Sequence, residues 1–191
     1  MKKRILCLTM SALMFTWVSC GDGRQDSTET AEDQNEETVD NKKEDDAEFA
    51  VKAADAGMLE VQLGTLALTK ASSPQVKQYA QMMVDDHTKA NNELKALAQQ
   101  KNITLPTTLG NENQRRYNNF NEKTGADFDK DYMDQMVKDH RDVIDEFEDQ
   151  AEDGNDAELK SWASSKLTAL RHHLEEAERI QEAVKNNKKN Q

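Results

Sequence analysis

The chain has 191 residues, enough for one domain with a sizeable core, and its 37 acidic and 25 basic residues give a formal net charge of −12. A strongly acidic chain without a basic stripe lacks the electrostatic attraction that dominates nucleic-acid affinity. Its surface is also repelled by anionic lipid headgroups. We therefore expect no nucleic-acid partner and no direct binding of the protein surface to a membrane.

The first 19 residues have the organisation of an export signal. Three basic residues at 2–4 precede an apolar stretch at 5–18, and the small Ser19 stands directly before Cys20. The apolar stretch is shorter than the roughly 20 residues that a membrane-spanning helix needs, so we expect it to be removed. The Val-Ser-Cys tripeptide that ends at Cys20 resembles the lipobox of lipoprotein precursors. It predicts cleavage before Cys20 and lipidation of that cysteine.

The cysteine content agrees with a lipid anchor. Cys7 lies in the segment to be removed, so the mature chain keeps Cys20 alone and can form no internal disulfide. Removal of residues 1–19 takes away three positive charges and makes the net charge −15. A diacylated cysteine holds a protein stably on a bilayer. We expect a bacterial envelope protein attached to a membrane through lipid on Cys20, at the outer membrane, on its periplasmic face or at the cell surface.

Residues 20–46 are expected to form a disordered acidic tether. The stretch 21–46 holds 11 acidic and three basic residues, and Val39 is its one large apolar side chain. A segment of this composition buries too little apolar surface to offset the entropy lost on folding. It predicts a flexible spacer between the lipidated cysteine and a folded domain.

The domain that follows, at 47–185, has the pattern of an all-α protein. Apolar residues recur at spacings of three and four, whereas β-branched alternation is rare. The pattern predicts four long helices, at about 47–71, 74–100, 127–151 and 159–184, followed by a polar tail at 186–191.

The connections between these helices predict their arrangement. Ser73 is a predicted N-cap with Pro74 at the first helical position, and Gly154 marks another short turn. The connection at 101–125, with a short helix at about 112–123, is too long for a simple turn. Short, long and short connections predict a ferritin-like four-helix bundle with a long crossover between helices two and three.

Helices two and three share a repeat that ends in a histidine. Because His87 and His140 fall on the apolar stripes of their helices, both imidazoles should point into the bundle. His173 lies on the stripe of the fourth helix, while His172 is about 100° away around the helix and should face outward. The aligned residues of the repeat are Tyr79, Met83, Val84, Asp86 and His87 with Tyr132, Met136, Val137, Asp139 and His140.

Inward histidines on facing helices are how helical bundles build metal sites. A carboxylate-bridged di-iron centre expects Glu-x-x-His, but Val84, Val137 and Leu170 stand three residues before the histidines. Each methionine of the repeat stands four residues before its histidine, so sulfur and imidazole are available to copper. The candidate ligands for copper or iron are His87, His140, His173, Met83, Met136 and Glu60.

Two other interpretations stay open. Buried histidines can be purely structural and hydrogen-bond across the core, with Asp86 and Asp139 as partners from neighbouring helices. A bundle interior can also hold haem or an organic ligand. Counted from the turn at Gly154, His173 lies about five residues, or roughly 7 Å, deeper than His140, so convergence of all three rings is not required by the sequence.

Five segments resemble the bacterial family called domain of unknown function 4142, which comprises ferritin-like envelope proteins. The resemblance spans about 47–185 and implies a ferritin-like bundle in the envelope, with no established activity and no catalytic residues to transfer. The segments are AGMLEV at 56–61, YAQMMVDDH at 79–87, ITLP at 103–106, YMDQMVKDH at 132–140 and LRHHL at 170–174.

Two functional hypotheses follow. The first is a non-enzymatic, lipid-anchored bundle with a binding, stress-related or structural role and an unknown protein partner. The second is a transition-metal binding protein, or a metal-dependent redox enzyme, that uses the inward histidines. The sequence contains no GxSxG, phosphate-binding glycine loop, CxxC or HExxH motif, so no catalytic residue is predicted.

Overall fold

The computed structural model describes residues 26–40 and 43–189. The predicted signal peptide at 1–19 and the lipidation site Cys20 therefore lie outside the described residues. Among the described residues, no helix combines the length and the apolar character needed to cross a membrane.

The described part of the chain is all-α, as the periodicity predicts. Its six helices coincide with the predicted ones, except for an additional helix at the N-terminal end and a last helix that continues into the predicted polar tail. They are α1 (Ser27–Thr38), α2 (Glu44–Lys70), α3 (Pro74–Lys101), α4 (Asn111–Asn121), α5 (Gly125–Asp153) and α6 (Ala157–Lys189). Within 26–40 and 43–189 no strand forms.

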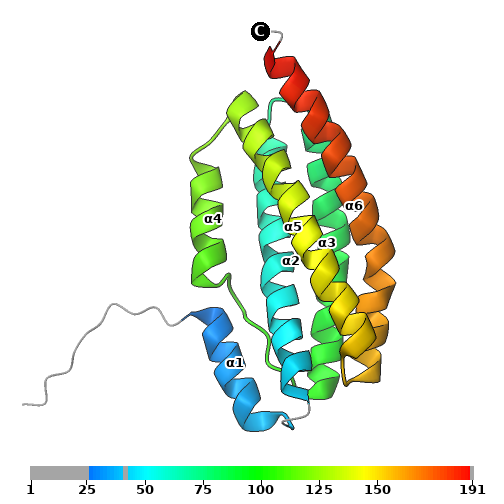
Figure 1. Ribbon diagram of the computed structural model, residues 1–191. Helices are drawn as coiled ribbons and strands as arrows, with labels where there is room; N and C mark the ends of the chain where they lie inside the picture. The colour runs from blue at the N-terminus through cyan, green and yellow to red at the C-terminus, as the bar shows by residue number, and fades with distance from the viewer. Residues whose placement is uncertain (1–25, 41–42, 190–191) are drawn as a thin grey trace, which may run out of the picture.

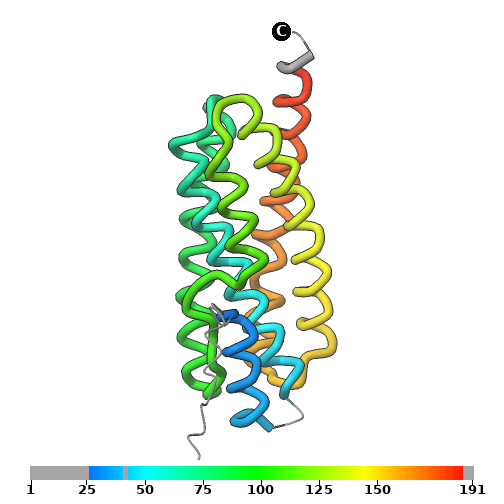
Figure 2. Tube along the Cα trace, turned by 90° about the vertical axis from the view of Figure 1, so that its left-hand side faces the viewer, coloured from blue at the N-terminus to red at the C-terminus, as the bar shows by residue number. Residues whose placement is uncertain are grey.

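The four long helices lie side by side (Figure 1, Figure 2). Helix α2 packs along α3 and α5 along α6, with further contacts between α2 and α5 and between α3 and α6. In Figure 1, α2 and α6 run upward and α3 and α5 run downward. The parallel directions of α3 and α5 require the chain between them to return along the molecule, and α4 does so beside α2.

The apolar stripes of these helices meet in two clusters of buried side chains. The upper core, toward the top of Figure 1, is filled by large residues. It includes Leu59, Leu63, Tyr79, Met83, Phe128, Tyr132 and Met136. The lower core contains more small residues and includes Phe49, Ala50, Ala53, Leu94, Phe147, Leu159 and Leu170.

The turn between α2 and α3 is fastened by polar groups. The Ser73 side chain accepts a hydrogen bond from the Val76 amide and caps α3, with Pro74 in the first turn, as predicted. The buried carboxylate of Asp129 on α5 accepts hydrogen bonds from the amides of Ser72 and Ser73. This contact ties the turn to the start of α5.

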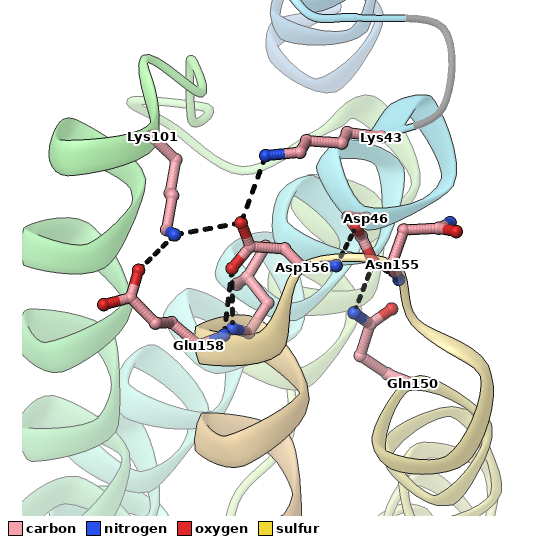
Figure 3. A network of polar contacts seen from close by, with 8 residues as sticks. Lys43, Asp46, Lys101, Gln150, Asn155, Asp156 and Glu158 are labelled. Atoms are coloured by element: carbon pink, nitrogen blue, oxygen red, sulfur yellow. Dashed lines mark hydrogen bonds and ion pairs between the residues drawn. The ribbon is translucent and has the colours of Figure 1, made fainter.

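A second network closes the lower end of the helices (Figure 3). Asp46, buried in the first turn of α2, accepts hydrogen bonds from the Gln150 side chain and from the amides of Asn155 and Asp156. Asp156 in turn caps α6 and pairs with Lys101 of α3. Asp46 therefore belongs to the folded domain, one residue before the predicted boundary.

The disorder predicted for residues 20–46 is wrong where the structure describes them. Helix α1 packs on α2, and its Ala31 and Asn35 are buried. The Asn35 side chain donates to the Thr104 carbonyl and accepts from the Thr104 amide. The Asp26 carboxylate caps α1 and accepts from the Asn111 amide. Polar side chains thus attach α1 to the connection between α3 and α5, which a hydrophobicity pattern does not register.

Candidate metal centre

Three histidines from three helices meet between the upper and lower cores. The ring centroid of His87 on α3 lies 5.8 Å from that of His140 on α5 and 5.5 Å from that of His173 on α6. The centroids of His140 and His173 are 5.4 Å apart. One nitrogen of each ring lies within 4.8 Å of the others, which is close enough for all three to bind one metal ion.

The convergence of His140 and His173 follows from the direction of their side chains. Measured from the ends of α5 and α6, His173 lies about three residues, or roughly 4.5 Å of helix rise, farther from the turn. In an α-helix, every Cα–Cβ bond leans toward the N-terminus of its own helix. Because α5 and α6 are antiparallel, the two side chains lean toward one another and compensate for the difference in depth.

Hydrogen bonds define which nitrogens face the centre. His140 Nδ1–H donates to the Met136 carbonyl at 2.9 Å, and His173 Nε2–H donates to the Asp86 carboxylate at 2.9 Å. The remaining nitrogens, His140 Nε2 and His173 Nδ1, are buried and have no hydrogen-bond partner among the described residues, and the same holds for His87 Nε2. Metal-binding histidines in proteins usually donate their second ring N–H to a carbonyl or a carboxylate in this way.

The surroundings keep the three imidazoles neutral. Burial lowers the pKa of His87 well below its usual value, and the neighbouring His140 and His173 lower it further. Burial and His173 lower the pKa of His140 to about 4. Burial also lowers the pKa of His173, although Asp86 opposes the shift. At neutral pH each ring therefore keeps an unprotonated nitrogen, the form that binds metal.

A cavity of about 240 Å³ adjoins the histidines. Glu60 of α2 lines it and is only 6% exposed, and its Oε2 has no hydrogen-bond partner among the described residues. Burial, together with the nearby charge of Asp139, raises the pKa of Glu60 to about 8. The structure thus places the predicted carboxylate beside the histidines, in a protonated form at neutral pH.

The two methionines of the predicted ligand set lie elsewhere. Met83 and Met136 are fully buried in the upper core and are not among the residues that line the cavity. Each stands one helical turn from its histidine, on the side of Tyr79 and Tyr132, and belongs with these tyrosines to the upper core. The spacing correctly predicts that the methionine and the histidine of each repeat share a helix face. It does not predict which residues of the other helices each side chain contacts.

The two aspartates of the repeat have different roles. Asp86 accepts the hydrogen bond from His173, as the structural interpretation predicts for a partner on a neighbouring helix. Asp139 instead pairs with Arg116 of α4 and accepts from Gln135. No sequence pattern indicates this role of Arg116, because α4 belongs to a long connection whose path helix periodicity does not predict.

Comparison with protein families finds a match over residues 29–180 to a family described as a domain of unknown function (DUF4142). The chain belongs to this family. The DUF4142 match begins inside α1 and ends in α6, so it covers all three histidines and most of the helix that the sequence predicts to be a spacer. No curated protein and no solved structure matched the chain.

Proposed function

We propose that this DUF4142 protein binds one transition-metal ion through His87, His140 and His173. The observation that supports this most is that three neutral imidazoles converge with one nitrogen of each within 4.8 Å of the others, while each ring has a buried nitrogen without a hydrogen-bond partner among the described residues. A buried polar atom without a partner costs about 1–3 kcal/mol, and neighbouring lone pairs also repel each other. A bound cation offsets both terms, whereas a purely structural histidine cluster would satisfy its nitrogens within the core.

The ligand set favours copper over iron. Imidazole suits copper, zinc, iron and nickel, and Cu²⁺ binds most tightly in the series of divalent first-row metals. Iron sites in helical bundles use several carboxylates. Glu60 is the one fully buried carboxylate among the described residues that line this cavity. The sulfur ligands that would favour Cu⁺ are in the upper core, so the proposed ion is Cu²⁺, with Zn²⁺ as its natural competitor.

The arrangement of the helices supports the finer assignment of a ferritin-like four-helix bundle. Two antiparallel pairs, α2 with α3 and α5 with α6, each have a short turn, and α4 lies in the long connection between them. A single long crossover of this kind is the ferritin-like connectivity.

The proposed place of action is the bacterial envelope, with lipid on Cys20 as the membrane anchor. The support is the basic, apolar and lipobox-like order of residues 1–20. Replacing Cys20 by Ser should abolish incorporation of labelled palmitate and leave the protein free of the membrane fraction. Unchanged labelling of Cys20→Ser would contradict the anchor.

Metal binding is tested by elemental analysis of the untagged protein from residue 26 onward. After incubation with Cu²⁺ and removal of excess metal, we expect about one ion per chain. His87→Gln and His140→Gln should each lower this content severalfold, whereas His172→Gln is the matched control on an exposed neighbouring histidine. Circular dichroism verifies that each variant is folded. Absence of bound metal, or an equal loss in His172→Gln, would refute the proposal.

A further inference from the structure

The cavity beside the histidines is elongated along the helices. On α2 its lining runs from Glu60 to Ala53, and on α5 from His140 to Phe147. Each stretch covers eight residues, whose ends are about 10 Å apart in helix rise. Because α2 and α5 are antiparallel, both stretches lead from the histidines toward the lower end of the molecule.

Small residues create this space. Ala53, Ala56 and Gly57 of α2 line it, together with Ala90 of α3 and Ala169 of α6. Above them, from Leu59 onward, α2 instead presents leucines that fill the upper core. The small side chains therefore leave space along this part of the four helices.

Aromatic rings line the end of the cavity that is remote from the histidines. The centroids of Phe147 and Trp162 are 5.4 Å apart, and Leu170 lies beside them in the lower core. Midway along, Asn91 packs directly on the backbone of Gly57, where an added Cβ would come within 2.0 Å of its Oδ1. The wall is thus mostly apolar, with the Asn91 amide between the metal ligands and the rings and charged side chains around it.

The charges around the cavity disfavour an anionic occupant. Four acidic side chains line it, of which Glu60 is protonated at neutral pH and three are charged, against two lysines, one of which, Lys166, pairs with Glu93. The acidic residues are Glu60, Asp86, Asp139 and Glu146. The matching occupant is uncharged and polar at the histidine end only.

We propose that the cavity binds a small neutral aromatic molecule with one nitrogen or oxygen donor, the donor at the metal and the ring against Phe147 and Trp162. This inference rests on the proposed metal site. Three protein ligands leave a coordination position open for an added molecule. The cavity volume of about 240 Å³ exceeds the roughly 150 Å³ of an engineered cavity that takes benzene. A mostly apolar lining with a few polar groups is typical of small-molecule sites.

The test uses the copper-loaded protein from residue 26 onward and two probes, imidazole and 4-phenylimidazole, at pH 8. The probes share the donor and differ by one phenyl ring. Binding is followed by the shift of the copper absorption and electron paramagnetic resonance spectra, with retained copper measured after each titration. We expect 4-phenylimidazole to bind about tenfold or more tightly than imidazole, since one phenyl ring becomes buried.

Cavity-filling variants make the test specific. Ala53→Leu and, independently, Ala90→Leu should reduce the preference for 4-phenylimidazole about tenfold while leaving copper content and imidazole binding unchanged. Ala96→Leu, at an exposed position of α3 outside the cavity, is the matched control and should keep the preference. Equal affinity of the two probes for the unmodified protein, or a preference that survives both cavity variants, overturns the aromatic site while the metal site stands. A protein that takes up no copper overturns both.

Discussion

The upper and lower halves of the helical assembly are built from the same four long helices but are filled differently. In the upper core, α2 contributes Leu59 and Leu63, which meet Phe128 and Tyr132 of α5 with almost no exposed surface. In the lower half, α2 contributes alanines and a glycine, and a cavity of about 240 Å³ remains beside the three histidines. The difference indicates a division of labour, with stability concentrated above and binding concentrated below.

The lower half lacks some of the interactions that stabilise a protein interior. Protein interiors are normally close-packed, and a void leaves its lining without dispersion contacts. Three buried histidine nitrogens without partners among the described residues lie at the same place, in addition to the unpartnered hydroxyls of Tyr79 and Tyr132 in the upper core. A site that is both incompletely filled and incompletely hydrogen-bonded, next to a well-packed core, is expected to be completed by a ligand.

The largest expected difference between the halves is the response to changes in side-chain volume. Leu63→Ala in the upper core should lower the free energy of unfolding by about 3 kcal/mol, because it creates a cavity where none exists. Ala53→Leu in the lower half should change the stability of the metal-free protein by about 1 kcal/mol or less, because it fills existing space. Urea unfolding followed by circular dichroism measures both. If Ala53→Leu lowers the free energy of unfolding as much as Leu63→Ala does, the two halves do not differ in their packing.

The second difference concerns pH. The folded protein holds His140 with a pKa of about 4, below the usual value near 6.5, so between these values the unfolded chain binds more protons. The contribution of His140 to the stability of the metal-free protein is therefore complete above pH 6.5 and is lost as the pH drops toward 4. Glu60, whose pKa is raised to about 8, acts in the opposite direction, because the folded state binds more protons at this group. His140 contributes up to about 1.4 kcal/mol per pH unit in this window.

The histidine contribution is isolated by comparing urea unfolding of the unmodified protein and His140→Gln at pH 7.0, 6.0 and 5.0. The variant should lose less stability on acidification, by about 1–2 kcal/mol over this range. The exposed His172→Gln provides the control and should follow the unmodified protein. Parallel curves for the unmodified protein and His140→Gln would contradict a neutral, buried His140.

The smallest expected difference is in the stability cost of adding a methyl group at two glycines of α2, Gly64 and Gly57. A Cβ on Gly64 would lie 3.0 Å from the Ala80 carbonyl oxygen and 2.9 Å from Val84, so the α2 and α3 backbones would have to separate. Gly64→Ala should destabilise by about 1–3 kcal/mol. At Gly57 the nearest atom is the movable end of Asn91, beside the cavity, so Gly57→Ala should cost about 1 kcal/mol or less. The melting temperatures of the two variants measure the two losses of stability. A larger loss in Gly57→Ala than in Gly64→Ala would contradict this prediction.

The sequence predicted the long helices and the inward histidines because both depend on local periodicity. Ser73 and Pro74 mark the start of α3 in the sequence and in the structure. Local periodicity does not predict the hydrogen bonds of Asn35 to Thr104, because they join segments far apart in the chain. Polar contacts of this kind stabilise α1 without an apolar stripe.

The same limit applies to the candidate site. The shared helix face of Met83 and His87 was visible in the spacing, but the structure was needed to show that the methionine fills the upper core. The cavity itself was not foreseen, because Ala53 and Gly57 are ordinary helix residues until their neighbours are known. The relative level of side chains on different helices depends on tertiary packing, which one sequence does not display.

The most direct test of the metal centre is an anomalous difference map from crystals of the copper-loaded protein. We expect one strong peak between α3, α5 and α6, about 2.0–2.1 Å from His87 Nε2, His140 Nε2 and His173 Nδ1. His87→Gln crystals treated in the same way should lack the peak. Anomalous density confined to surface carboxylates, with none between the three imidazoles, would contradict the account.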